Sequence, residues 1–281
     1  MLSNTEIDQY LSGSRLYGND LSLSEIEQWY ADEGEGYANL GASDKNSYQY
    51  AYHALNQLHG YANLKLQSDL EVLGFGSAYG EELEPVLDLA KHITIIDPSD
   101  AFVKHQIGTV PCTYVKPTIS GQLPFAAGHF DFVTAFGVLH HVPNVFTVLS
   151  EIARVMKPGA TMLLREPVVS MGDWRFPRAG LTRHERGIPR DLLNGMISDV
   201  GLVVRHEALC VFPPLSIIFQ RVVPRIYNNL IITRLDKVFC KLFSWNLTYH
   251  AISNWRKIRP TSAFYILEKP CSGDSECMQK S

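Results

Sequence analysis

The sequence predicts an α/β fold in which a mostly parallel sheet carries helices on both faces. From about residue 69 onward, short apolar segments alternate with longer segments whose apolar residues recur at helical spacing. Strands that alternate with helices typically form such a sheet. The chain has 281 residues, of which 46% are hydrophobic, so it is long enough for one large domain with additions.

Seven segments have the length and apolar content of strands. In chain order they are residues 69–75, 92–97, 113–115, 130–136, 160–166, 202–211 and 262–268. Helices are expected over residues 81–91, 145–157 and 189–200. We therefore expect the α/β domain to comprise residues 65–211 and 261–270.

Two additions to this domain are expected to be helical. Residues 1–64 are acidic and rich in tyrosine, and Ser24 and Glu27 have the spacing of a capping box, which favours a helical N-terminal cap. Residues 212–260 are long for a connection, and their apolar residues recur at helical spacing. This insertion would either cover the ligand side of the sheet or support its back. Residues 271–281 are expected to be a flexible tail.

Charge is unevenly distributed along the chain. Residues 1–100 carry 17 acidic and 4 basic side chains, whereas residues 101–281 carry 12 acidic and 21 basic ones. An anionic partner would meet the basic part, or the two parts attract each other. The net charge of −4 and the lack of a dense basic patch argue against nucleic acid as a partner.

The remaining composition excludes other classes of protein. No apolar run reaches the roughly 18 residues that a membrane span needs, and the polar N-terminus is unlike a secretory signal. The five cysteines include no CxxC pair, so we expect no metal site. We expect free thiols and a cytoplasmic location.

A glycine-rich turn follows the first expected strand and precedes a helix. It comprises Gly74, Phe75, Gly76, Ser77 and Gly80. Glycines allow a tight turn and a close approach of the backbone to a ligand, whose anionic group can meet the first amides of the next helix. The same glycines could also form an ordinary turn.

The next expected strand ends at Asp97, before Pro98 and 21 residues after Gly76. A carboxylate at this position typically holds the hydroxyls of a ribose. The alternative is that Asp97 caps a turn. Together the two signals predict a nucleotide-like ligand beyond the carboxyl ends of the strands.

A series of motifs makes the prediction specific. Leu123-Pro124-Phe125 precedes Phe130-Asp131, which is followed by Leu139-His140-His141-Val142 and then by Lys157-Pro158-Gly159. This order resembles the type 11 branch of the class I S-adenosylmethionine-dependent methyltransferases over about residues 65–170. The resemblance implies a Rossmann-like, seven-stranded sheet with S-adenosylmethionine as the cofactor, and it argues against NAD.

The resemblance also implies a position for each part of the cofactor. The glycine-rich turn, including Gly76 and Gly80, would border the methionine part, and Asp97 would hold the ribose. Ile119 and Ser120 would flank the adenine, and Phe136 to Leu139 would lie beside the sulfonium. The chain departs from the family pattern at Gly74, at Ala78 and in segment 116–122, which lacks an acidic residue.

Catalytic candidates follow the fourth and fifth expected strands. His140 and His141 follow the fourth, and Glu166 follows the fifth. An alcohol acceptor needs a base within hydrogen-bond reach, and histidine titrates near neutral pH. The alternatives are hydrogen-bonded structural roles for the histidines and a salt bridge with an arginine for Glu166.

Arginine is concentrated after the fifth expected strand. The six arginines are Arg165, Arg175, Arg178, Arg183, Arg186 and Arg190. Because arginine binds carboxylate and phosphate groups with two hydrogen bonds, we expect an anionic acceptor near His140, His141, Glu166 and residues 175–186. Surface arginines exposed to solvent are the alternative.

The function expected from these signals is O-methylation of a small-molecule or sugar acceptor. That acceptor would be anionic or lipid-linked. One alternative is a lipid-like acceptor at a membrane surface, contacted by the basic amphipathic segment 226–243. Another is a methyltransferase-like cofactor-binding protein without catalysis.

Overall fold

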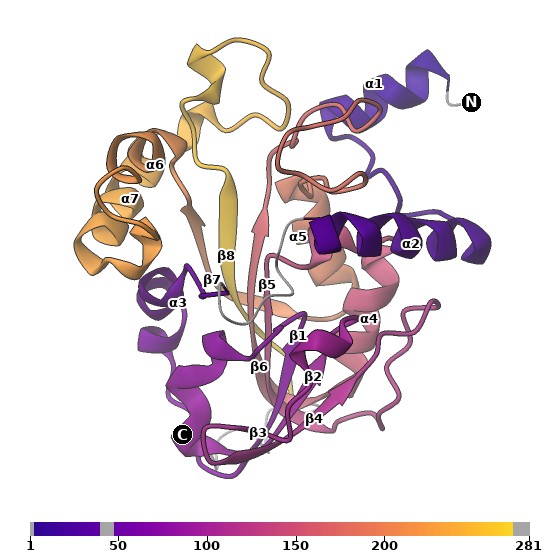
Figure 1. The fold of residues 1–281 in the computed structure, drawn as a ribbon, viewed down its shortest axis with the longest axis vertical. Coiled ribbons are helices and arrows are strands. Elements are labelled where there is room, and N and C mark those ends of the chain that lie inside the picture. Colours follow the sequence, from indigo (N-terminus) through magenta and orange to yellow (C-terminus); the bar gives the residue numbers. More distant parts are fainter. Residues whose placement is uncertain (1–2, 40–47, 272–281) are drawn as a thin grey trace.

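The computed structural model describes residues 3–39 and 48–271, and it contains one eight-stranded sheet (Figure 1). The strands are β1 (Leu70–Phe75), β2 (Ala90–Ile96), β3 (Gln106–Ile107), β4 (Val110–Val115), β5 (Phe130–Phe136), β6 (Met156–Pro167), β7 (Val203–Cys210) and β8 (Ser262–Glu268). Their order in the sheet is β3-β4-β2-β1-β5-β6-β8-β7. The predicted α/β fold is confirmed.

The sheet is parallel from β4 to β6. Strand β8 runs antiparallel to both of its neighbours, β6 and β7. The seven expected strands correspond to β1, β2, β4, β5, β6, β7 and β8. The eighth, β3, has two residues and forms a short antiparallel pair with β4. It was missed because a two-residue strand has no measurable periodicity.

Helices cover both faces of the sheet. On one face lie α4 (Val145–Val155) and α5 (Arg190–Asp199), whose apolar sides join the core cluster that contains Leu73 and Leu164. On the other face lie α3 (His53–His59) and α7 (Leu230–Leu242), which pack against a second cluster around Val72 and Phe264 (Figure 1).

The connection from β1 to β2 differs from the prediction. Residues 81–91 were expected to form a helix that continues from the turn, but Glu81–Leu89 is a 3₁₀ helix and Ala90 already begins β2. Pro85 lies inside this segment. Proline has no N–H and restricts its neighbours, which disfavours an α-helix.

The N-terminal residues form helices that lie beside the carboxyl ends of the strands. They are α1 (Asn4–Ser12) and α2 (Leu23–Asn39). The capping pair of α2 is Ser22 and Glu25, two residues before the predicted pair: Ser22 N donates to Glu25 Oε2 at 2.8 Å. Trp29 of α2 is buried and its indole N–H donates to His141 O at 2.7 Å. The helix therefore rests directly on the loop after β5.

Residues 212–260 contain α6 (Pro213–Phe219), α7 and three short 3₁₀ turns, namely Ile226–Asn228, Ser244–Asn246 and Trp255–Lys257. Asp236 attaches α7 to the end of β7. Its carboxylate is fully buried and accepts hydrogen bonds from Val211 N at 3.0 Å and Phe212 N at 2.7 Å.

The expectations for the cysteines, for a membrane span and for the C-terminal tail have different outcomes. Cys112, Cys210 and Cys240 are free and buried, but Cys271 is disulfide-bonded, so the expectation of free thiols is wrong for that residue. Among the described residues, no helix is long and apolar enough to cross a membrane. The tail from residue 272 onward lies outside the described residues.

Candidate active site

The carboxyl ends of β1, β2, β4 and β5 bring most of the predicted cofactor residues together. The turn after β1 meets Asp97: Ala78 N donates to Asp97 Oδ2 at 3.1 Å. The same turn meets the loop after β5, because a Cβ atom on Gly76 would lie 2.5 Å from the Val138 side chain. Gly76 also has a φ of 68°, a conformation that favours glycine.

The remaining predicted cofactor residues line the same edge of the sheet. Gly74 and Phe75 are the last residues of β1, and Ser77 is buried behind them. Pro98 is exposed next to Asp97, and Ile119 and Ser120 lie in the exposed loop after β4.

Asp97 retains the capacity to bind further hydroxyl groups. Its Oδ1 accepts a hydrogen bond from Ser99 N at 3.0 Å and its Oδ2 accepts the one from Ala78 N. A carboxylate has about four acceptor positions, so each oxygen can accept one more bond. Burial raises the pKa of Asp97 above its usual value. This donor and acceptor set fits a ribose diol.

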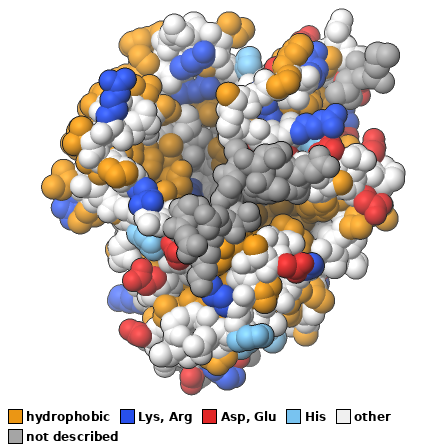
Figure 2. All heavy atoms as spheres, in the orientation of Figure 1, with side chains coloured by type: hydrophobic (Ala, Val, Ile, Leu, Met, Phe, Trp, Pro, Cys, Tyr) orange, Lys and Arg blue, Asp and Glu red, His pale blue; other side chains and the backbone are white. Residues whose placement is uncertain are grey.

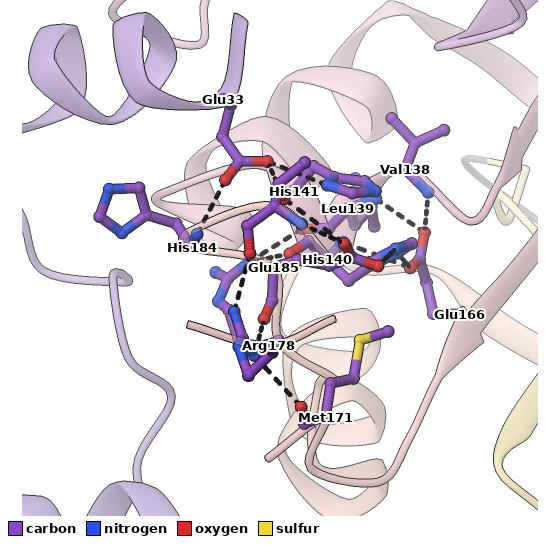
Figure 3. Close-up of polar contacts among 12 residues, drawn as sticks. Glu33, Val138, Leu139, His140, His141, Glu166, Met171, Arg178, His184 and Glu185 are labelled. Carbon is purple, nitrogen blue, oxygen red and sulfur yellow. Dashed lines mark hydrogen bonds and ion pairs between the residues drawn. The ribbon is translucent and has the colours of Figure 1, made fainter. Parts of the chain in front are cut away.

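His140 is oriented by Glu166, as Figure 3 shows. The Nδ1–H of His140 donates to Glu166 Oε2 at 2.8 Å, and Glu166 has no solvent exposure. The other oxygen of Glu166 accepts hydrogen bonds from Val138 N at 2.9 Å and Leu139 N at 2.7 Å. Glu166 therefore fixes both the short 3₁₀ turn Leu139–His141 and the imidazole that follows β5.

The second nitrogen of His140 faces Glu185, with His140 Nε2 and Glu185 Oε1 3.6 Å apart. Burial opposes the charged imidazole, but hydrogen bonds and the charges of Glu166 and Glu185 outweigh it and raise the pKa of His140 to about 9. Despite its burial, Glu185 has its pKa lowered to about 2, chiefly by the hydrogen bond with His140 and the charges of both histidines. The pair is an imidazolium beside a carboxylate at neutral pH.

His141 faces the N-terminal helix instead of the cavity. Its Nδ1 lies 3.1 Å from Glu33 Oε2. The same Glu33 carboxylate accepts hydrogen bonds from Thr182 Oγ1 at 2.6 Å and from His184 N at 2.9 Å. Burial and the neighbouring His140 charge lower the pKa of His141. Glu33 thus ties the loop after β5 to the segment 170–188.

A cavity of about 650 Å³, called here the inner cavity, opens beside His140. It is lined by side chains from the ends of β5 and β6, by the segment Tyr48–Tyr52, and by residues of the loop after β6. Its lining includes Tyr50, Tyr52, Gly137, His140, Arg165 and Glu185. Of the predicted site residues, Phe136, His140 and Glu166 line it, whereas His141 does not.

Most of the six arginines expected to bind an anionic acceptor contact the protein itself. Arg178 donates to the backbone carbonyls of Met171, Thr182, Arg183 and Glu185, and Arg186 to those of Tyr17, Leu139, His140 and Val142. Arg175, Arg183 and Arg190 form ion pairs with Asp173, Asp32 and Glu207. Of the six arginines, Arg165 is the one that lines the inner cavity.

A second cavity of about 780 Å³, the outer cavity, lies between the loop after β6 and residues 212–260. Its lining includes the apolar side chains Pro213, Pro214, Ile217, Ile252 and Ile258. Val169 and Thr261 line both cavities. The two cavities are therefore adjacent, with these two residues between them.

Sequence reasoning missed the residues contributed by the N-terminal part. Glu33, Tyr50 and Tyr52 border the site although they precede the α/β domain. A glutamate in an acidic helix carries no distinctive pattern. The segment is rich in tyrosine, but composition does not reveal its position over the strand ends, which depends on tertiary packing.

Comparison with known proteins agrees with this architecture. A family model described as a methyltransferase domain matches residues 73–164. A "Probable S-adenosylmethionine-dependent methyltransferase" of Mycolicibacterium smegmatis is 28% identical over 35% of this chain and 38% of its own length. The sterol 24-C-methyltransferase of Neurospora crassa is 32% identical over 36% of this chain and 28% of its own. The ubiquinone biosynthesis O-methyltransferase of Xanthomonas oryzae is 29% identical over 43% and 54%.

Two solved structures share the fold. The phospholethanolamine N-methyltransferase 2 of Haemonchus contortus has a TM-score of 0.56 at 13% identity, covering 89% of this chain and 61% of that one. The YcgJ protein of Bacillus subtilis has a TM-score of 0.50 at 18% identity, covering 79% and 99%. The chain matches roughly a third to a half of the length of its curated relatives.

Residues 73–164 therefore form a methyltransferase domain. The sheet order and the turn after β1 agree with the class I type, and a relative that it resembles is named as a probable S-adenosylmethionine-dependent methyltransferase.

Proposed function

We propose that the protein transfers a methyl group from S-adenosylmethionine to an oxygen atom of a lipid-like acceptor at a membrane surface. One observation carries this choice of acceptor: residues 212–260 expose apolar and basic side chains together and expose no acidic one. The segment contains eight lysines and arginines and a single acidic residue, Asp236, which is fully buried.

Helix α7 has an outward apolar stripe. Ile231, Leu235, Val238 and Leu242 are 40–70% exposed and are spaced along one side of the helix. Arg234, Lys237 and Lys241 lie between them and are exposed as well. The side facing the protein holds Ile232, Thr233, Asp236 and Cys240 instead. The apolar residues of α7, whose helical spacing predicted a buried face, therefore lie on two sides of the helix. One set faces the protein and the other is exposed to solvent.

The neighbouring elements extend this surface, which we call the basic apolar face. Ile217, Ile218, Val222, Trp245, Ile252 and Trp255 are all more than half exposed. Figure 2 shows orange and blue side chains gathered over α6 and α7. Proteins rarely expose so much apolar surface without a partner. Apolar side chains with interspersed lysine and arginine suit the boundary of an anionic bilayer.

The cavities supply a route from this face to the site. Ile217 and Ile252 belong both to the basic apolar face and to the lining of the outer cavity, which adjoins the inner cavity at Val169 and Thr261. A lipid-like acceptor could keep its apolar part along this route while its reactive group lies next to His140. The names of two of the relatives refer to sterol and ubiquinone, which supports an acceptor of apolar character.

The geometry supports a role for each residue in the proposed reaction. Bound S-adenosylmethionine supplies an electrophilic methyl group. Asp97 would hold the ribose hydroxyls, which fixes the cofactor beside the loop after β5. In its neutral form, which predominates above its raised pKa of about 9, His140 would accept the proton of the acceptor hydroxyl at Nε2. Glu166 would hold the ring and Glu185 would stabilise the resulting imidazolium. Positioning of this kind can lower the barrier by roughly 7–11 kcal/mol in favourable cases.

A second candidate is O-methylation of a small polar molecule or a glycan. The tyrosine hydroxyls, the imidazole and the charged groups that line the inner cavity favour it, since a sugar needs many hydrogen-bond partners. In that case the basic apolar face would bind another protein or remain exposed.

Two measurements test the proposal. Calorimetry with S-adenosylhomocysteine tests cofactor binding, and absence of binding would contradict the methyltransferase assignment. Methyl transfer is then assayed on extracted membrane lipids and on a soluble glycan fraction, with labelled S-adenosylmethionine. Transfer to the lipid fraction is expected; transfer confined to the glycans would favour the second candidate.

A further inference from the structure

We propose that Arg165 binds an oxyanion of the acceptor, a phosphate or carboxylate group close to the oxygen that is methylated. The inference rests on the proposed function, because it takes the inner cavity as the acceptor site. It adds a specificity-determining residue and an anionic headgroup to a lipid-like acceptor.

Arg165 is a buried cation at the carboxyl end of β6. Its residue is 6% exposed. The guanidinium carbon lies 3.8 Å from the ring centroid of Tyr52 and 5.6 Å from that of Phe136. Nη1 donates to Asn56 Oδ1 at 3.2 Å. These contacts hold the plane of the guanidinium still, but a neutral amide and two rings do not neutralise its charge.

No carboxylate among the described residues forms an ion pair with Arg165. The two carboxylates that line the same cavity are engaged elsewhere. Glu166 binds His140 and backbone amides, and Glu185 accepts from Thr182 N at 3.0 Å and faces His140. A buried charge that lacks an ionic partner is costly. A ligand that provides one would therefore bind strongly at this end of the cavity.

Gly137 places this cation next to the reacting position. Gly137 N donates to Arg165 O at 2.6 Å. A Cβ atom on Gly137 would lie 3.8 Å from Arg165 Nη2 and 3.6 Å from His140 Cε1. The guanidinium and the imidazole thus border the same space, which the missing side chain leaves open. An acceptor could place its oxyanion on Arg165 and its hydroxyl at His140.

The test uses three small probes of the same ring size: phenyl phosphate, phenylacetate and uncharged benzyl alcohol. Calorimetry on the protein saturated with S-adenosylhomocysteine should give at least tenfold tighter binding for one of the anions than for benzyl alcohol. The better of the two anions identifies phosphate or carboxylate as the preferred group. Equal binding of all three probes would overturn the inference while leaving cofactor binding intact.

Arg165→Gln should weaken binding of the preferred anion at least tenfold and leave benzyl alcohol unchanged. Arg175→Gln is the matched control, because Arg175 pairs with Asp173 outside the cavity, and it should bind all probes normally. If the glutamine variant does not fold, Arg165→Lys replaces it, since this variant keeps the charge. Its affinity for the preferred anion should fall at least threefold because lysine cannot form the paired hydrogen bonds. Unchanged anion binding in a folded Arg165 variant would overturn the proposal.

The same titrations address the cofactor's own carboxylate. If Arg165→Gln weakens the binding of S-adenosylhomocysteine at least tenfold while the protein remains folded, Arg165 binds the cofactor and the proposal is wrong. If the variant binds S-adenosylhomocysteine within threefold of the wild-type affinity and loses the preference for the anion, the acceptor assignment stands. Failure of the wild-type protein to bind S-adenosylhomocysteine would contradict the proposed function itself.

Discussion

Glu166 binds His140 twice, because its Oε2 accepts both the ring Nδ1–H at 2.8 Å and the backbone N–H at 3.3 Å (Figure 3). With the two bonds to Val138 N and Leu139 N, the carboxylate uses all of its acceptor positions. It therefore has no lone pair left for an acceptor proton. These contacts favour a positioning role for Glu166 and leave His140 as the proton acceptor at the cavity.

Replacing Glu166 by glutamine should impair both stability and catalysis. The glutamine amide group would face backbone N–H donors, so one donor loses its partner, at a cost of about 1–3 kcal/mol in the free energy of unfolding. Turnover should fall at least tenfold because His140 is no longer fixed. Denaturant unfolding and methyl transfer measure the two effects. Glu207→Gln, which breaks the partly exposed pair with Arg190, is the control and should cost under about 1 kcal/mol.

The pH dependence of stability tests the charge of His140. Its pKa is raised from 6.5 to about 9 in the folded protein, so its stabilising contribution is complete below about pH 6.5 and is lost as the pH rises through 9. The loss should be of the order of 3 kcal/mol. His140→Asn keeps a donor towards Glu166 but removes Nε2, and it should lack this dependence. His141→Asn should retain it, and parallel curves for all three proteins would contradict the assignment.

The rate should follow the same ionisation. If His140 accepts the acceptor proton, kcat/KM rises with unit slope towards a pKa of about 9 and then levels off. His140→Asn should be flat in this range and at least a hundredfold slower at pH 9. A rate that falls above pH 9 would mean that the protonated form is the active one.

Asp97→Ala should weaken the binding of S-adenosylhomocysteine. Loss of a charged acceptor for the ribose hydroxyls costs about 1.5–3 kcal/mol, or on the order of 10- to 150-fold in affinity. Asp100→Ala removes a nearby exposed carboxylate that pairs with Lys116 and serves as the control. An affinity equal to that of the wild type in the Asp97 variant would exclude this binding pose.

The sequence allowed the sheet and the placement of Gly76 and Asp97 at its edge to be predicted, because both depend on local signals. The seven strands are apolar segments bounded by turns, and Gly76 and Asp97 lie where their strands end. The acceptor side could not be predicted in the same way. Arg165 and Arg178 have the same chemistry, and only packing decides that one lines the inner cavity while the other binds backbone carbonyls. The orientation of α7 could not be predicted either, because the spacing of its apolar residues does not decide which side of the helix is buried.

The basic apolar face should bind anionic membranes. Vesicles with anionic phosphatidylglycerol should bind the protein, whereas vesicles of phosphatidylcholine alone should bind it much less. Neutralising Arg234, Lys237 and Lys241 to glutamine removes about 1 kcal/mol per charge, which lowers vesicle affinity on the order of 100-fold. The matched control neutralises three exposed basic residues of other elements, Lys91, Lys116 and Arg205, and should bind normally.

Hydrogen exchange identifies the element that docks. Residues 230–242 should gain protection when anionic vesicles are added, while α4 and α5 should not change. Replacing Ile231 and Val238 by serine should abolish this gain, because charge alone gives weak and reversible attachment. Equal loss of vesicle binding in the two triple variants would mean that net charge, and not this face, attracts the membrane. Protection that stays the same in every condition, together with full activity of the Arg234, Lys237 and Lys241 variant, would leave α7 as a support for the sheet.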